Sequence, residues 1–522
     1  MKKKGLLGKV FYLGLVFPIM ASMLILGLTE AAEISAPKAA PTLQPQYGGV
    51  LKIAEATGPT TPFGYPPDGV GEASVSGKPA IEPLLRQHYD GRIEPWLAAD
   101  WKIASDKKSI TFTLKKGIKF HDGTDFNAEA VKFNLEGVKA AGRPGTKDWS
   151  SIDVVDDYTL RVTLAQYSNI ALTRFSGGGG AMISPTAFKT KGKAWANWNP
   201  VGTGPFQFVS FERDVTTKYK KFNDYWQKGK PYLDGVELLY IKDPMTQSAA
   251  MRAGEAHVLN TNNGKMMADL KAMGLGFITY ADGTVVLIPD STNADSPLSN
   301  KKVREAIEYA IDKEAIAKAK SYGFWVPAYQ LPCPGTMAYI KNFQGRHYDP
   351  AKAKQLLTEA GYPNGFKTKI IPHFVIDRDI MVSIQAYLAK VGITVDLDFV
   401  DMGKYNDLRR KGWNNGFLCQ PFGMYPNYLQ TIQTYLETKA LDFPTLKKPA
   451  EVDDMLNEAL STVDPEIPRV QKLIKLFSDE VTVIPISTTA RGAFLQKNVH
   501  DTGYLSLGMW TEWTPDKAWM SK

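Results

Sequence analysis

Residues 96–136 read WLAADWKIASDKKSITFTLKKGIKFHDGTDFNAEAVKFNLE, and this stretch decides the fold class. Within it, SITFTL at 109–114 alternates polar and apolar side chains, as a strand with one buried face does. A Lys-Lys-Gly turn follows at 115–117, and Asn127 is a favourable N-cap for a helix over 128–140. A strand, a turn and a helix in close succession predict a mixed α/β fold.

The same mixture extends along the rest of the chain. Further strands are expected at 49–54, 159–164, 205–211, 235–241 and 393–400, and further helices at 301–320, 349–360 and 380–391. These elements fall into two regions, 47–280 and 290–487, which agrees with 522 residues being too many for one simple core. The glycine run 177–180 lacks the spacing of a phosphate-binding loop, so we expect a flexible loop there.

The N-terminus has the pattern of a secretory signal peptide. Four lysines at positions 2, 3, 4 and 9 precede residues 10–28, which carry no charge, and Thr29 and Ala31 suit a cleavage site. We therefore expect a signal peptide over 1–31, a flexible Ala/Pro-rich spacer over 32–46 and a periplasmic protein. The alternative is an uncleaved membrane anchor, because the apolar run is about long enough to span a bilayer. Leu28, not a cysteine, stands directly after Leu26-Gly27 at the end of the apolar run, so a lipoprotein is not expected.

The dispersed charge and the absence of catalytic motifs argue against several classes of function. The net charge of +8 is dispersed rather than clustered, which argues against nucleic-acid binding. No CxxC, HExxH, GxSxG or SxxK motif occurs, so neither a metal, a cofactor nor an enzyme activity is predicted. Cys333 and Cys419 could pair in an oxidising compartment, but their spacing does not decide this.

The stretch at 96–136 resembles the signature of the family 5 extracellular solute-binding proteins, which are the oligopeptide-, dipeptide- and nickel-binding receptors of ABC importers. Its matching positions include Trp101, Gly117 and the FHDG of 120–123, whereas Lys116 and Ala130 depart from the family pattern. Further blocks follow in the family's order: PVGTGPF at 200–206, NDYW at 223–226, PYLDG at 231–235 and VREA at 303–306. The resemblance covers nearly all of 47–520.

The resemblance implies an α/β fold of the type II periplasmic-binding-protein class, a clamshell of two lobes that close on a ligand. The expected lobe I comprises 47–80, 200–284 and 488–522, with an extra subdomain over 81–199, and lobe II comprises 285–487. The implied partners are a small-molecule ligand and the permease and ATPase subunits of an ABC importer, with a monomeric receptor. An exported hydrolase and a sensory receptor on the same clamshell remain alternatives.

The ligand chemistry is read from one segment in which the chain departs from the family. Peptide receptors of this kind hold the ligand ammonium with an Asp in a loop that corresponds here to GFLCQPFGMYPNY at 416–428, which contains no acid. A buried ammonium without a carboxylate would cost several kcal/mol. We therefore expect a peptide-like compound or a small organic acid with an apolar or aromatic body.

Candidate ligand-binding residues follow from the same alignment of blocks. Arg378 matches the position where dipeptide receptors place an Arg against the ligand carboxylate, although it could equally be a surface Arg paired with Asp377 or Asp379. Aromatic and methionine side chains suit an apolar ligand, or alternatively they form the hydrophobic core of a lobe. The candidates of this kind, with the weaker candidate His88, are Phe422, Met424, Tyr425, Tyr428, Phe63, Tyr65 and Trp325.

Overall fold

The computed structural model describes residues 44–522, except 70–74, 89–90, 144, 424, 504–505, 508–509 and 512–514. Gln46–Lys522 form one compact unit. The predicted signal peptide and nearly all of the predicted spacer lie outside the described residues. Within the described part of the chain, no helix combines the length and the apolar character that crossing a membrane requires.

The largest sheet runs through the whole unit and is mixed, with parallel and antiparallel pairs. Its strands, in spatial order, are β10 (Phe206–Glu212), β11 (Thr216–Lys221), β12 (Gly235–Tyr240), β1 (Val50–Glu55), β13 (Val258–Thr261), β19 (Ile484–Leu495), β14 (Gly276–Pro289), β18 (Gly416–Gly423), β16 (Lys367–Pro372) and β17 (Thr394–Leu397), and β15 (Val326–Pro327) pairs with β19. The fold class predicted from the sequence, α/β, is confirmed.

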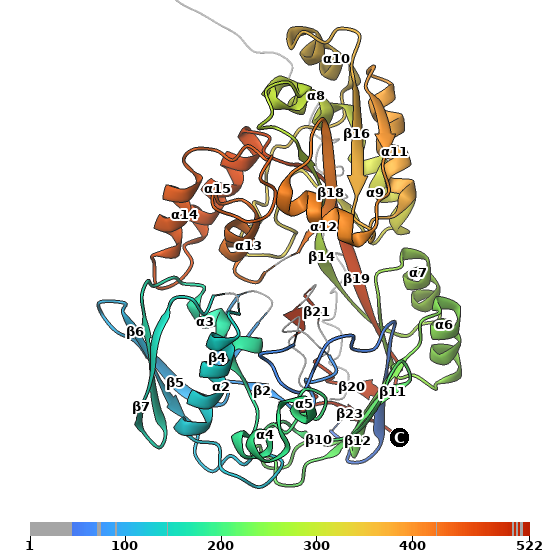
Figure 1. Ribbon diagram of the computed structural model, residues 1–522. Helices are drawn as coiled ribbons and strands as arrows, with labels where there is room; N and C mark the ends of the chain where they lie inside the picture. Colours follow the sequence, from blue (N-terminus) through green and yellow to red (C-terminus); the bar gives the residue numbers. More distant parts are fainter. Residues whose placement is uncertain are drawn as a thin grey trace, which may run out of the picture. The chain divides into compact units, whose positions relative to one another are not determined.

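Two long antiparallel strands, β14 and β19, connect the two ends of this sheet. At one end β19 pairs with β13, where Leu495 lies opposite Val258. At the other end β14 pairs with β18, from Gly283 opposite Gly423 onward. Figure 1 shows both strands rising from the lower group of elements into the upper group. We call them the hinge strands, because the chain passes between the predicted lobes along them.

Separate hydrophobic clusters lie on either side of the hinge strands. Beside the sheet of lobe I lie a cluster around Ile53, Val236 and Leu238 and another that includes Ala54 and Leu270. Lobe II contains two clusters, and β18 contributes to both. The clusters are consistent with the predicted division into lobes, whose boundaries stay a prediction.

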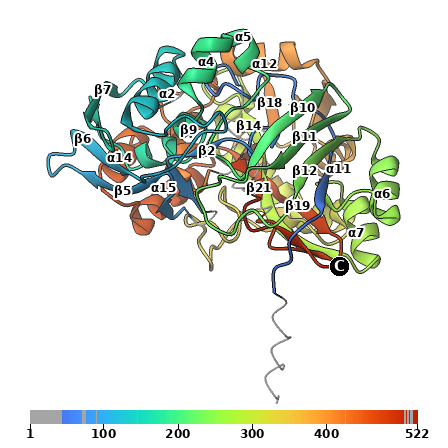
Figure 2. The same cartoon turned by 90° about the horizontal axis from the view of Figure 1, so that it is seen from below.

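Residues 84–182 of lobe I have a cluster of their own, between a four-stranded sheet and α2 (Ala128–Ala140). The sheet has the order β5 (Ala98–Ile103), β6 (Ser109–Leu114), β8 (Thr159–Leu164) and β7 (Trp149–Asp156). Figures 1 and 2 show this sheet on the side of lobe I opposite α6 (Pro244–Ala253) and α7 (Gly264–Ala272). This separate core lies within the predicted subdomain 81–199.

The remaining elements complete the two lobes. In lobe I these are β2 (Glu82–Pro83), β3 (Leu85–Gln87), β4 (Ile93–Pro95), α3 (Ala171–Arg174), β9 (Ala181–Met182), α4 (Pro185–Lys191), α5 (Lys193–Ala196), β20 (Val499–His500), β21 (Ser506–Leu507), β22 (Trp510–Thr511) and β23 (Trp519–Met520). In lobe II they are α8 (Lys301–Ala310), α9 (Lys313–Ser321), α10 (Pro350–Glu359), α11 (Arg378–Ala389), α12 (Met402–Lys411), α13 (Tyr428–Tyr435), α14 (Val452–Leu460) and α15 (Ile467–Asp479).

Local signals in the sequence predicted several elements correctly and one helix wrongly. Asn127 caps α2 by accepting a hydrogen bond from the Ala130 amide, as predicted. The single helix expected over 301–320 is two helices, α8 and α9, because Ile311 is extended and Asp312 caps a new helix through the Ala315 amide. The apolar spacing continues across this break, so the spacing alone could not reveal it.

Two segments that were expected to be loops are ordered differently. The glycine run contains a 3-10 turn at Gly178–Gly180, and it is tightly packed rather than a flexible loop. A Cβ atom on Gly180 would lie 2.0 Å from the Phe175 carbonyl oxygen. The segment 416–428 is mostly strand β18, and α13 begins at its last residue, so only 424–427 connect the two elements.

Candidate functional site

The carboxyl ends of three lobe II strands meet near the middle of the hinge strands. β16 runs parallel to both β17 and β18, so the loops after Pro372, Leu397 and Gly423 leave one edge of the sheet. Gly423 lies opposite Gly283, halfway along β14. In open α/β sheets, ligands bind outside the carboxyl ends of parallel strands. This edge is therefore the candidate lobe II wall of a ligand site.

Lobe I touches lobe II close to this edge, through what we call the interlobe contact. The Asn169 amide nitrogen donates to the Ala459 carbonyl at 2.8 Å, and its oxygen accepts from Asn427 Nδ2 at 3.2 Å. Ile170, which follows in the subdomain, is buried in a hydrophobic cluster of lobe II. Two further bonds reach the turn after α14, from Lys107 to the Ser461 carbonyl and from Tyr167 to the Val463 carbonyl.

A small cavity lies in lobe I beside the glycine run, and we call it the lobe I cavity. Its volume is about 60 Å³. Its walls are mainly apolar or backbone, and two cationic side chains contribute to them. The lining residues are Pro62, Phe63, Pro66, Gly69, Gly77, Lys78, Ile81, Pro83, Arg143, Gly177, Gly178 and Ala181. No Asp or Glu is among these described residues, so the local charge suits an anion.

Close packing of the glycine run against the preceding helix shapes one wall of this cavity. A Cβ atom on Gly179 would lie 2.7 Å from the Arg174 carbonyl oxygen, closer than real Cβ atoms come. Glycine therefore permits the chain to fold back on α3, which brings Gly177 and Gly178 to the cavity. The run thus has a geometric role that its composition did not reveal.

The predicted lobe I candidates occupy different surroundings. Phe63 lines the lobe I cavity and packs edge-on against Trp198 and Phe211. Tyr65 is buried against Phe188, at 4.7 Å between ring centroids, and burial raises the pKa of its phenol. His88 is half-buried, with Nε2 at 2.9 Å from a Glu94 carboxylate oxygen. Of these three residues, only Phe63 lines the cavity.

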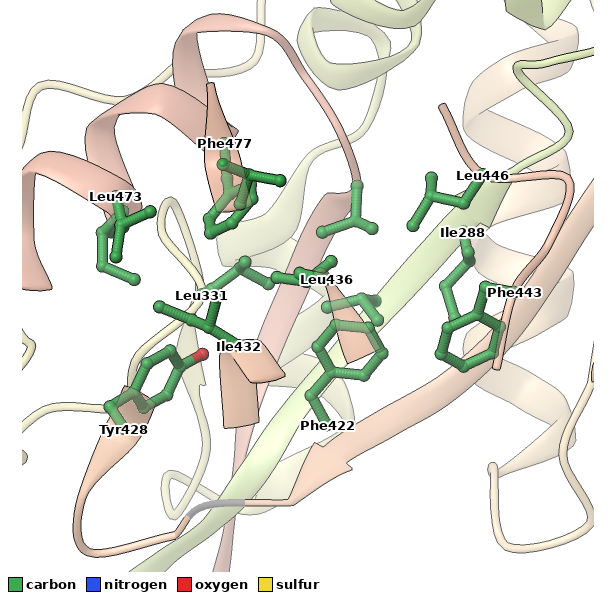
Figure 3. Packing of buried hydrophobic residues seen from close by; sticks show 14 of the residues in the cluster. Ile288, Leu331, Phe422, Tyr428, Ile432, Leu436, Phe443, Leu446, Leu473 and Phe477 are labelled. Carbon is green, nitrogen blue, oxygen red and sulfur yellow. The ribbon is translucent and has the colours of Figure 1, made fainter. Parts of the chain in front are cut away.

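The aromatic candidates of β18 and α13 lie mostly inside lobe II. Phe422 is 1% exposed and stacks on Tyr435 at 4.8 Å between centroids, and Tyr428 is also 1% exposed (Figure 3). Burial raises the pKa of Tyr428 well above its ordinary value, so the phenol stays neutral. Tyr425 is half-buried in the connection between the two elements, and Met424 lies outside the described residues. The structure therefore places Phe422 and Tyr428 in the core, where neither offers a ligand much surface.

The last two candidates lie at other places on lobe II. Arg378 is exposed at the start of α11, and its guanidinium carbon lies 4.4 Å from the ring centroid of Phe399. Trp325 is half-buried and packs against hydrophobic clusters on both sides of the hinge strands. The two cysteines are free and buried, so the possible disulfide is not formed.

Sequence reasoning missed the cationic residues of lobe I. Arg143 and Lys78 line the cavity, whereas Arg174 lies against Gly179 and Gly145, which are close in sequence to the lining residues Gly178 and Arg143. The glycine run was the available signal, since a run of four small residues permits a close approach of backbone to another group. Its partner segment at 143–145 is more than thirty residues away in the sequence, and only the fold brings the two together.

Comparisons with known proteins match most of the chain. A model of the bacterial extracellular solute-binding proteins, family 5 (Middle), matches residues 92–435. The glutathione-binding protein GsiB of Salmonella choleraesuis (strain SC-B67) is 34% identical over 329 residues, which are 60% of this chain and 62% of GsiB. The matched part of the chain thus spans about three fifths of the length of this curated relative.

Two solved structures share the fold over nearly their whole length. The periplasmic binding protein DppA from Helicobacter pylori, solved in complex with the peptide STSA, has a TM-score of 0.74 and 25% identity, with 91% of this chain and 99% of DppA covered. HbpA2 from Haemophilus parasuis has a TM-score of 0.80 and 22% identity, with 91% and 100% covered. At 22% identity, the likeness to HbpA2 shows the fold alone.

Proposed function

Because the chain belongs to the bacterial extracellular solute-binding proteins of family 5, we propose that it is an extracytoplasmic receptor for a small ligand. The receptor binds its ligand between lobe I and lobe II and delivers it to the permease and ATPase subunits of an ABC importer. The ligand is a peptide-like compound or a small organic acid. We propose that the receptor acts as an exported monomer from which the signal peptide has been removed.

The hinge strands are the observation that carries this proposal. β14 and β19 pair from Gly276 opposite Leu495 to Leu287 opposite Ile484, with two register shifts on the way, so one pair of strands joins both lobes. Bending along two strands can move the lobes while their separate cores stay packed. A ligand that contacts both lobes interacts better with the closed arrangement and therefore shifts the population toward it.

The ligand class rests on the relatives and on the cavity together. GsiB is named for glutathione and DppA is solved with a peptide, which favours a peptide-like ligand. Segment 416–428 carries no acid that could pair with an ammonium group, and the lobe I cavity contains cations instead. Both observations favour a ligand that is recognised through an acidic group. Nothing in the comparisons favours the exported hydrolase or the sensory receptor.

Small-angle scattering with and without ligand tests the proposed function. The compounds to compare are glutathione, the peptide Ser-Thr-Ser-Ala and a set of aromatic acids, each first screened by thermal shift. A binding compound should raise the melting temperature and reduce the radius of gyration, because the lobes close on it. A radius of gyration that stays constant at saturating ligand would count against closure of the lobes.

A further inference from the structure

Arg174, the last residue of α3, is largely enclosed and has no charge partner among the described residues. Its side chain belongs to a residue that is only 9% exposed. Among the described residues, no carboxylate or carbonyl pairs with its guanidinium, and it makes no cation–π contact. None of its guanidinium nitrogens is among the buried side-chain atoms that lack a hydrogen-bond partner, so solvent reaches them. An arginine that is largely enclosed and still offers its donors to solvent is well placed to bind an anion.

Other buried cations of this protein are compensated. Lys313 is 1% exposed and forms an ion pair with Glu308 at 2.9 Å. Arg304 is 4% exposed and donates to four backbone carbonyls, at Val481, Leu298, Ser299 and Glu480. Arg174 differs from both because its five N–H donors have no acceptor in the described part of lobe I. A ligand that supplies an acceptor would pair with these open donors.

The backbone around Arg174 leaves room for its guanidinium and connects it to the lobe I cavity. A Cβ atom on Gly145 would lie 2.0 Å from Arg174 Nε and 2.6 Å from its Cζ, so the guanidinium lies directly against Gly145 and would have to shift for any larger residue there. Gly145 also has a φ of +80°, which glycine adopts readily. Two residues before it, Arg143 lines the cavity. Arg143 also has no ion pair among the described residues.

We propose that Arg174 and Arg143 bind a carboxylate group of the ligand at the lobe I cavity, with the apolar part of the ligand against Phe63. This inference rests on the proposed function and names its ligand class as an organic acid. A guanidinium matches a carboxylate through two parallel N–H···O bonds, so two arginines can satisfy all the lone pairs of one carboxylate. None of the described lining residues is an acid that would compete with the ligand for the two cations.

Free acids paired with their methyl esters provide the first test, which needs no variant. The pairs are phenylacetate, 4-hydroxyphenylacetate, glutathione and Ser-Thr-Ser-Ala, each measured by thermal shift and by calorimetric titration of the wild-type chain. The free acid of a binding pair should stabilise the protein, and its ester should bind at least about tenfold more weakly because a charge-assisted hydrogen bond is lost. Equal binding of acid and ester would overturn the proposal.

Charge-removing variants provide the second test. Arg174→Gln and Arg143→Gln should each raise the Kd of the binding acid at least about tenfold, whereas Arg161→Gln, an exposed arginine on β8, should leave it unchanged. Arg174→Gln should also leave the melting temperature of the ligand-free protein about unchanged, since it removes a charge that no described residue pairs with and that solvent reaches. If Arg174 had a purely structural role, Arg174→Gln would instead lower that melting temperature. Arg174→Lys keeps the positive charge and controls for the loss of the planar guanidinium donors.

The failures of the two proposals are distinguishable. Unchanged acid binding in both Arg174→Gln and Arg143→Gln, or a loss confined to Arg378→Gln, would overturn this inference and leave the receptor function standing. If only neutral or cationic compounds bind, this inference is likewise overturned and the receptor function still stands. If no compound of the screen binds and native mass spectra of the purified protein show no retained small molecule, the receptor function fails, and the inference fails with it.

Discussion

Asp282 and Arg491 join the two hinge strands through a bidentate ion pair. Arg491 Nε lies 3.1 Å from Asp282 Oδ1, and Nη2 lies 3.0 Å from Oδ2. Asp282 is at a register shift of β14, between Ala281 and Gly283, and Arg491 projects from β19. The pair therefore fixes the geometry of the ladder at the point where the lobes connect.

Removing one partner of this pair should destabilise the protein. Asp282→Asn should lower the free energy of unfolding by about 1–3 kcal/mol, less than for a fully buried pair because Arg491 is 28% exposed. Urea denaturation measures this change. The surface pair Lys265–Asp269 provides the matched control, since Asp269→Asn should change the same quantity by less than about 0.5 kcal/mol. Equal effects of the two substitutions would contradict a structural role for the hinge pair.

The interlobe contact should depend on the side chain of Asn169. Asn169→Ala removes hydrogen bonds to Ala459, Thr462 and Asn427, and scattering should show a larger radius of gyration in the ligand-free protein. The Kd of a binding ligand should rise as well, because the closed arrangement becomes less populated. Asn199→Ala is the control, since its amide bonds only to the nearby Trp195 carbonyl. An Asn169→Ala protein with unchanged scattering would show that this contact does not hold the lobes together.

Two substitutions should distinguish a core role from a ligand-binding role for the aromatic residues of β18 and α13. The Tyr428 hydroxyl is buried and has no hydrogen-bond partner among the described residues. Tyr428→Phe should therefore keep or raise the melting temperature and leave ligand binding unchanged. Phe422→Ala should cost about 3–5 kcal/mol of unfolding free energy, as truncation of a core aromatic does. Weaker ligand binding by an equally stable Tyr428→Phe protein would restore Tyr428 as a ligand contact.

Glu82 should make stability depend on pH in an unusual direction. Its fully buried carboxylate accepts hydrogen bonds from Trp96, Tyr225, Thr203 and Trp226, and burial raises its pKa from 4.5 to about 7. Between these two values the folded protein retains a proton that the unfolded chain releases, so stability is lost as the pH rises through this window. The loss should not exceed about 1.4 kcal/mol per pH unit.

A comparison with Glu82→Gln isolates this contribution. Denaturant unfolding at several pH values should show the stability of the wild type falling relative to Glu82→Gln across the window from 4.5 to about 7. The opposing contribution of His121, whose pKa burial lowers to about 4, is common to both proteins and cancels in the difference. Parallel stability curves for the two proteins would show that Glu82 is already ionised at low pH.

Local chemistry made much of the fold predictable from the sequence. Asn127 and Asp349 are capping residues whose partners lie three residues away, so each helix start was visible without tertiary information. The break between α8 and α9 was not visible, because apolar spacing continues through Ile311. Arg304 is buried and bonds to backbone carbonyls, which the VREA pattern at 303–306 does not indicate by itself.

The site was less predictable, because it depends on which faces are buried and on distant segments. β18 is a central strand buried on both faces, so an aromatic residue such as Phe422 belongs to the core whichever way it points. Arg174 lies against Gly145 because the fold brings two distant segments together, which no local pattern encodes. The assignment of Arg378 to the ligand stays a prediction, and its exposed position over Phe399 makes it the competing candidate to Arg174.

Native mass spectrometry tests the central claim most directly, namely that this chain is a receptor for a small acid. The protein is measured as purified without refolding, and again after incubation with the paired acids and esters. The account predicts a one-to-one complex with a single low-mass acid, absent from spectra of Arg174→Gln. A bare chain under both conditions, or a complex that Arg174→Gln retains in full, would contradict it.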